Sequence, residues 1–157
     1  MASSPPRNIE IFDRITAYTF IKLYESFPIP QNLYLEEIYH EAVQGCTDEN
    51  EAFQIYTSYI TSTISFLADE KFIQYDQNTN PMQSSPEYFG VRLTLKGFSL
   101  LGATPKTVIE KTNNTPQSSF IELLKSSFST GTKSALSDIV KSLCMYAVKT
   151  ISDSVTA

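Results

Sequence analysis

The chain has 157 residues, of which 41% are hydrophobic and 12% aromatic, so it can bury a core of ordinary size and is not globally disordered. Its formal net charge of −5 gives no overall attraction to nucleic acid or to anionic lipid. This length fits one domain, or a small domain with an appendage.

The ends of the chain and its cysteines indicate a compartment. The first residues contain no basic stretch followed by an apolar run, so the sequence shows no secretory signal. No window of about 18 residues is both uncharged and apolar throughout, as a membrane-spanning helix requires. Cys46 and Cys144 lie far apart without a metal-type spacing, which favours two reduced thiols over one structural disulfide. Together these features predict a cytoplasmic protein.

The first predicted element is a helix over 8–27, which follows a flexible Ser/Pro-rich leader over 1–7. Asn8 can cap its start, and two prolines after Phe27 end it. Its apolar residues fall on several sides of the helix rather than on one stripe: Ile11, Phe12, Ile15, Tyr18, Phe20, Leu23 and Phe27. Such a helix needs cover on more than one face, which predicts burial against the C-terminal tail or against a second subunit.

Two further helices are predicted before the first strand. A short helix over 33–43 is followed by Gly45, at a natural C′ position. Asp48 then caps a third helix, and Glu51 three residues later completes the pattern of a capping box. One buried face is predicted along the third helix, because five apolar residues recur at intervals of three and four: Phe53, Tyr56, Ile60, Ile64 and Leu67.

The next segments predict a β-hairpin and a closing helix. Strands are expected over 72–75 and 88–93, on either side of a polar loop over 77–86. Thr94 can cap a short helix that runs through Leu101. Three helices, a strand, a loop, a strand and a closing helix are the order of a winged helix-turn-helix domain.

Two segments resemble that superfamily in detail. Residues 65–73 (SFLADEKFI) are similar to the end of the third helix that leads into the wing, and residues 92–101 (RLTLKGFSLL) to an apolar strand followed by Leu-Thr-x-x-Gly-x-x-Leu-Leu. The resemblance covers about residues 8–103 and implies a mainly α fold with a small antiparallel β wing. Winged helices serve as DNA readers, as protein-interaction modules and as dimerisation platforms, so the resemblance does not decide the function.

A polar connector over 104–117 leads to an amphipathic helical tail over 118–157, with an interruption near Gly131. The apolar face of this tail, with Phe12 and Phe20 of the first helix, is the predicted interface with a protein partner or with further copies: Leu136, Ile139, Val140, Leu143, Ala147 and Ile151. Packing on the winged-helix domain and action on a membrane are alternatives for the same face. The lysines at 125, 133, 141 and 149 are about 80° apart around a helix, so they form no single basic stripe.

The residues that could carry catalysis are few. His40 is the only histidine, and with Glu37 it has the Glu-x-x-His spacing of di-iron bundles. That chemistry needs a second such pair, which the chain lacks, so we expect His40 to lie on an exposed helix face. Neither cysteine nor any serine lies in a nucleophile motif, and there is no glycine-rich phosphate loop. The sequence therefore predicts no enzyme and no metal or other cofactor.

The charge distribution separates the remaining functions. From Phe27 through Glu70, the segment that contains the helix-turn-helix, there is no Lys or Arg and there are eight acidic residues. DNA binding draws most of its affinity from cations that neutralise phosphates. The expected function is therefore protein–protein interaction or homo-oligomerisation through this acidic face and the tail. A dimeric DNA-binding regulator is the first alternative, with Lys71, Arg92 and Lys96 as contacts, and a membrane-acting effector that uses residues 118–157 is the second.

Overall fold

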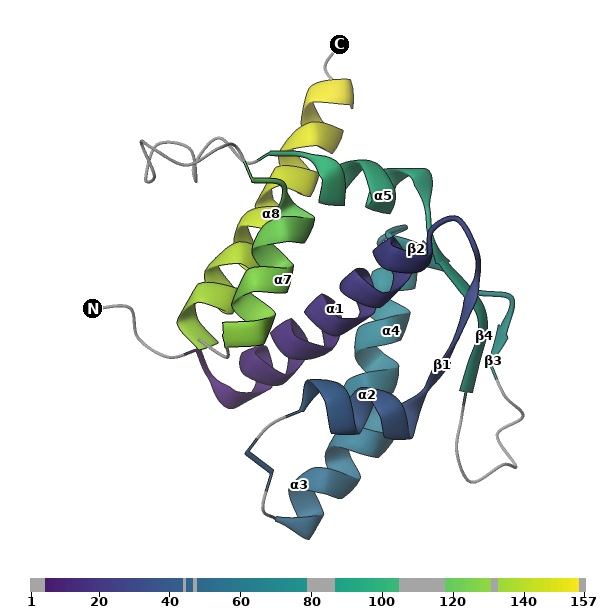
Figure 1. Cartoon of the computed structure of the whole chain (residues 1–157), viewed down its shortest axis with the longest axis vertical. Coiled ribbons are helices and arrows are strands. Elements are labelled where there is room, and N and C mark those ends of the chain that lie inside the picture. The colour runs from purple at the N-terminus through teal and green to yellow at the C-terminus, as the bar shows by residue number, and fades with distance from the viewer. Residues whose placement is uncertain are drawn as a thin grey trace.

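The computed structural model describes residues 5–43, 45–46, 48–78, 87–104, 118–130 and 133–155 (Figure 1). The chain is mainly α-helical, with a small antiparallel sheet and a C-terminal helical segment, which confirms the predicted fold class. Its elements follow in this order: α1 (Arg7–Ser26), β1 (Gln31–Tyr34), α2 (Leu35–Ala42), α3 (Glu49–Gln54), η1 (Ile55–Tyr59), α4 (Ile60–Asp69), β2 (Ile73–Gln74), β3 (Gln77–Asn78), β4 (Glu87–Leu93), α5 (Leu95–Gly102), α7 (Phe120–Thr130) and α8 (Lys133–Val155).

Helix α1 is the central helix, and other elements cover it on several sides (Figure 1). It contacts α2, α4, α5, α7, α8 and β4. Its apolar side chains are buried in several directions: Ile11, Ile15, Ala17, Phe20 and Leu23. The predicted need for cover on more than one face is confirmed, and the chain's own elements supply that cover. The helix begins at Arg7 after Pro6, so Asn8 lies in the first turn rather than at the cap.

The segment predicted as a helix over 33–43 begins instead with a strand. β1 pairs with β4, and Leu33 lies opposite Tyr88 in that pairing. Leu33 is fully buried between exposed neighbours, which is the alternation of a strand with one covered face. Helix α2 starts only at Leu35 and ends at Ala42, with Val43 as its C-cap. Gly45, predicted at C′, therefore lies one position after C′, and its φ is positive at 72°.

The third helix contains a π-helical turn that its sequence periodicity did not predict. This turn, η1, separates α3 from α4 and adds a residue to the helical repeat. The buried face is therefore made by Ile55, Ile60, Ile64 and Leu67. The predicted face is confirmed from Ile60 onward, but Phe53 is 67% exposed and Tyr56 is only half-buried.

The cap of this helix is partly as predicted. The carboxylate of Asp48 accepts a hydrogen bond from the backbone N–H of Asn50 at 3.0 Å, which confirms Asp48 as the N-cap. The carboxylate of Glu51 is used elsewhere, because it accepts hydrogen bonds from the guanidinium of Arg7. A tertiary ion pair with α1 has thus taken the place of the second half of the capping box.

Strand β4 is the centre of the sheet. It pairs antiparallel with β1, β2 and β3, and the sheet order is β1-β4-β2. β3 lies within the predicted polar loop, and residues 79–86 of that loop are outside the described residues. After β4, the hydroxyl of Thr94 accepts a hydrogen bond from the backbone N–H of Gly97 at 3.0 Å, so the predicted cap of α5 is confirmed. This order of helices and strands is compatible with a winged-helix shape.

The C-terminal tail forms two helices, α7 and α8, which lie side by side and run in opposite directions (Figure 1). Helix α7 ends at Thr130 and α8 begins at Lys133, and Gly131, near which an interruption was predicted, lies outside the described residues. Both helices contact α1 and α5. Their inward side chains join the same core as the rest of the chain: Phe120, Ile121, Leu124, Leu136, Val140, Leu143 and Ala147. The tail therefore braces the N-terminal part of the same molecule.

Candidate interaction surface

The continuous helix made by α3, η1 and α4 has one long exposed side, which we call the helix-turn-helix face. Apart from two aromatic residues and the acids near its ends, the face carries small or polar side chains: Asn50, Gln54, Thr57, Ser58, Ser62 and Ser65. Phe53 is 67% exposed and Phe66 is 44% exposed. An open, shallow hollow beside Phe66 is lined by Thr61, Ser62, Ser65 and Asp69. Aromatic side chains are enriched at protein interfaces, so these two rings are candidate anchors for a partner.

The face is negative and contains no cation. Its acidic residues Glu49 and Asp69 are exposed, as are the neighbouring Glu41, Asp48 and Glu70. Among the described residues, none of these five carboxylates has an ion-pair partner. The cations nearest to it lie at its edges: Arg7 pairs with Glu51, and Lys71 and Lys96 lie beside Glu70 after the end of α4. Figure 1 shows that α3 lies at the end of the molecule opposite the C-terminus of α8.

Two acidic residues of the segment 27–70 are neutralised by α1. Lys22 lies 2.6 Å from the carboxylate of Glu37, and the hydroxyl of Tyr18 donates to the same oxygen at 2.7 Å. These hydrogen bonds lower the pKa of Glu37. Arg7 pairs with Glu51, as described above. Of the acidic residues that remain unpaired, Glu41 lies beside Tyr18 and Lys22 of α1, whereas Glu49 and Asp69 lie on the exposed side of α3 and α4.

His40 lies on an exposed side of helix α2, as the sequence predicted. Its side chain is 63% exposed, and Nε2 lies 3.7 Å from the carboxylate of Glu36. Glu37, the partner required by a Glu-x-x-His metal motif, is held by Lys22 and Tyr18 instead. Among the described residues no group of three or more His, Cys, Asp and Glu side chains is arranged to hold a metal ion.

The three candidate DNA contacts lie around the base of the sheet. Lys96 donates to the backbone carbonyl of Glu70 at 2.8 Å and lies over the ring of Phe72. With the Gln74 amide turned so that its oxygen faces Arg92, the guanidinium donates two hydrogen bonds to it, at 2.6 and 2.7 Å. Lys71 is exposed in the turn after α4, with a φ of 67°. Two of the three cations are thus already held by neighbouring groups.

The residues predicted as a partner or oligomer interface lie mainly inside the chain's own core. Five of them are buried: Phe20, Leu136, Val140, Leu143 and Ala147. Phe12 and Ile139 are half-buried, and the ring of Phe12 meets Phe66 edge to face at 5.6 Å. The side chain of Ile151 is outside the described residues. In this structure the apolar face of the tail is covered by α1, α5 and α7, so these residues do not form a free surface.

Sequence patterns did not indicate a polar seam between α1 and α8. Glu10 of α1 is 6% exposed and lies 3.3 Å from the ammonium of Lys133. Asp13 is 3% exposed, and one of its carboxylate oxygens has no hydrogen-bond partner. Burial raises the pKa of Asp13 to about 6, the negative charge of Glu10 adds to this, and a hydrogen bond with Ser137 opposes it. Burial also raises the pKa of Cys144. No local signal predicts these groups, because they meet only when α8 docks.

Comparison with protein-family models, with curated proteins and with solved structures finds no match to this chain. Across the described residues, no helix has both the length and the apolar character that crossing a membrane requires. The surface itself must therefore support any proposal about function.

Proposed function

We propose that this chain is a member of the winged helix-turn-helix superfamily that binds a protein partner through its helix-turn-helix face. The order of helices and strands, and the position of β4 between β1 and β2, support the membership. The sequence similarity of residues 65–73 and 92–101 to the ends of the wing supports it further. In such a fold, the helix made by α3, η1 and α4 occupies the place of the recognition helix.

One observation carries the choice of a protein partner over DNA. The helix at the recognition position has no cation on its exposed side, and its acidic residues Glu49 and Asp69 are unpaired among the described residues. A DNA duplex would meet this surface with phosphates, which carry the same sign of charge. Exposed Phe53 and Phe66 instead offer aromatic anchors of the kind that dominate protein interfaces.

The proposal is for a binding protein and not for an enzyme. His40, the single histidine of the sequence, is exposed, and the charged group nearest to it is Glu36. Cys144 is a poor nucleophile, because burial raises its pKa and keeps it protonated. A general base and a nucleophile within hydrogen-bond reach of each other would be needed for acyl transfer, and neither group supplies them.

A site-specific photo-crosslinker at Phe53 tests the proposed function. In cells that produce the protein at its natural level, we expect one dominant protein adduct from position 53 and none from position 89, where Phe89 is exposed on the sheet. Adding Asp69→Lys to the crosslinker variant should remove the adduct if this face forms the interface. Equal adducts from both positions would contradict the proposal.

DNA binding is tested with the same purified protein. We expect no measurable change in the fluorescence anisotropy of a labelled duplex at physiological salt, with either random sequence or the DNA upstream of the gene. Submicromolar binding that weakens steeply with salt would overturn the proposal in favour of a DNA-binding regulator. Lys71, Arg92 and Lys96 would then be the first residues to replace.

A further inference from the structure

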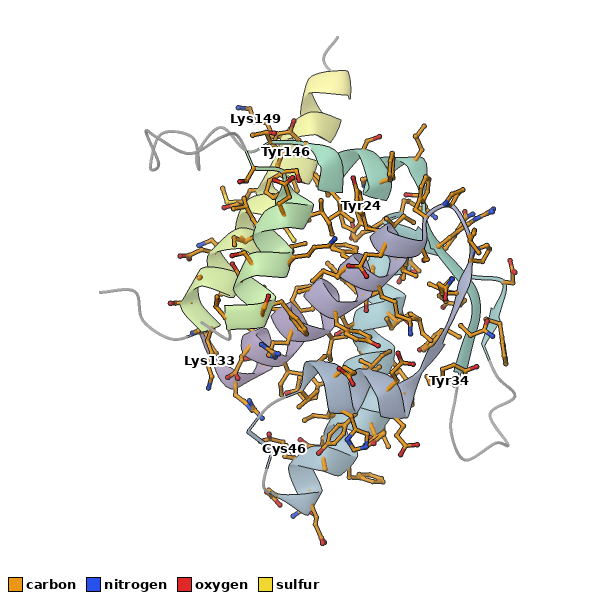
Figure 2. The ribbon with its side chains drawn as sticks, in the orientation of Figure 1. Tyr24, Tyr34, Cys46, Lys133, Tyr146 and Lys149 are labelled. Carbon is orange, nitrogen blue, oxygen red and sulfur yellow. The ribbon has the colours of Figure 1, made fainter. Side chains whose placement is uncertain are left out.

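Helix α8 has an outward side that its apolar periodicity did not predict. Four exposed residues on this side recur at intervals of three and four, Asp138, Lys141, Met145 and Val148, and the exposed Lys149 follows four residues after Met145. Met145 is 63% exposed and Val148 is 68% exposed, so two large apolar side chains lie one turn apart in water. In Figure 2, Lys149 lies toward the C-terminal end of α8 and points away from the body of the molecule. We call this stripe the outer α8 face.

The lysines of the tail fall into two classes. Lys125 lies 3.2 Å from Glu25, and Lys133 lies 3.3 Å from Glu10, so both hold the tail to α1. Lys141 and Lys149 are exposed, and neither forms an ion pair with any side chain that the structure describes, a set that leaves out the side chains of residues 150–155. The outer α8 face therefore has an exposed apolar pair between two exposed lysines that do not hold the tail to α1.

The helix-turn-helix face is complementary to the outer α8 face. It offers exposed Phe53 with unpaired acidic residues, whereas the outer α8 face offers Met145 and Val148 with two exposed lysines against the one acid Asp138. Glu49 and Phe53, at the α3 end of the helix-turn-helix face, cannot meet the outer α8 face within one molecule, because α3 and the C-terminal half of α8 lie at opposite ends of it (Figure 1). Complementary charge and exposed apolar surface therefore match each face to the other face of a second copy.

We propose that the outer α8 face of one copy binds the helix-turn-helix face of the next copy. This inference rests on the proposed function and names the protein partner as the chain itself. The contact joins two different surfaces, so a bound pair still has one free face of each kind. Such a head-to-tail contact produces rings or open chains rather than a closed symmetric dimer.

Two charge-reversal variants test the contact. One variant carries Glu49→Lys and Asp69→Lys on the helix-turn-helix face, and the other carries Lys141→Glu and Lys149→Glu on the outer α8 face. All four side chains are exposed, so both variants should keep the circular dichroism spectrum of the wild type. The swap Glu25→Lys with Lys125→Glu is a matched control, because it moves two charges but preserves the ion pair between α1 and α7.

Sedimentation velocity at low ionic strength measures the assembly. The wild type and the control should form species heavier than the 17.6 kDa monomer, in amounts that rise with protein concentration and fall with added salt. Each reversal variant alone should remain monomeric, because its two faces carry like charge. A mixture of the two variants should assemble again, because each altered face then meets a face of opposite charge.

Three results would overturn the inference. One is a wild type that remains monomeric at every concentration, and another is a mixture that fails to assemble although each variant alone has lost assembly. The third is a wild type that is monomeric in solution but binds vesicles containing phosphatidylserine through Lys141 and Lys149. That result would assign the outer α8 face to a membrane. A Phe53 adduct with a different protein would refute self-assembly and leave the proposed function standing, whereas salt-sensitive duplex binding would refute the proposed function itself.

Discussion

The buried carboxyl group of Asp13 should make the protein less stable as the pH rises. Asp13 is 3% exposed, one carboxylate oxygen has no hydrogen-bond partner, and burial raises its pKa from 3.8 to about 6. In the unfolded chain the group ionises at its ordinary pKa, so ionisation favours the unfolded state over this interval. The protein should therefore be most stable, as far as Asp13 is concerned, below pH 3.8, and it should lose that stability progressively up to about pH 6.

The magnitude follows from the pKa difference. One pKa unit corresponds to about 1.4 kcal/mol, so a rise of roughly two units lowers the free energy of unfolding by about 3 kcal/mol above pH 6. The Asp13→Asn variant keeps the shape of the side chain and cannot ionise. It should be more stable than the wild type by up to about 3 kcal/mol at neutral pH, and the difference should disappear toward pH 4.

Urea denaturation followed by circular dichroism, repeated across this pH range, measures the difference between the two proteins. Asp138→Asn is the matched control, because Asp138 is an exposed aspartate of α8, and its effect on stability should be small. A difference between Asp13→Asn and the wild type that is constant with pH would show that Asp13 is ionised or solvated in the same way in both states. Asp13 would then not be buried where α8 packs against α1.

The remaining predictions concern packing. Leu143→Ala should lower the free energy of unfolding by about 2–5 kcal/mol, because Leu143 is 1% exposed. The exposed Met145→Ala should change it by less than about 0.5 kcal/mol, and equal losses would mean that α8 is rotated or undocked. Ile60→Ala should likewise cost about 2–5 kcal/mol and the exposed Thr57→Ala less than about 0.5 kcal/mol, and a reversed order in thermal denaturation would refute the buried face of the third helix. Gly97→Ala should reduce the yield of folded protein, because the added methyl group would overlap a backbone carbonyl; a variant of unchanged melting temperature would contradict the close approach of α5 to the wing.

Several elements could be predicted because the interactions that form them are local. Thr94 bonds to the backbone of Gly97 only three residues away, and Asp48 bonds to Asn50. The inward face of α8 follows from apolar residues spaced three and four apart, such as Leu136, Val140 and Leu143. The absence of cations from Phe27 through Glu70 is likewise a property of the sequence, and it is the reason why we propose a protein partner rather than DNA.

Other features depend on partners that are distant in the sequence. Leu33 lies in a strand rather than a helix because β4, more than fifty residues later, pairs with it. The π-helical turn η1 brings Ile55 into the core and leaves Phe53 exposed, which a strict helical repeat cannot show. Glu51 was expected to complete a cap and instead pairs with Arg7, because α1 passes beside α3.

The identity of a free surface was also decided by tertiary structure. The sequence determined that the first helix needs cover on several faces and that the tail has an apolar side. It did not determine what covers them, because a second subunit and the same chain could do so equally well. Only the packing of α7 and α8 on α1 buries Leu143 within one molecule and leaves Met145 and Val148 outside. The physical reason is that periodicity records which side chains share a face, whereas the free energy of burial depends on which surface comes to cover that face.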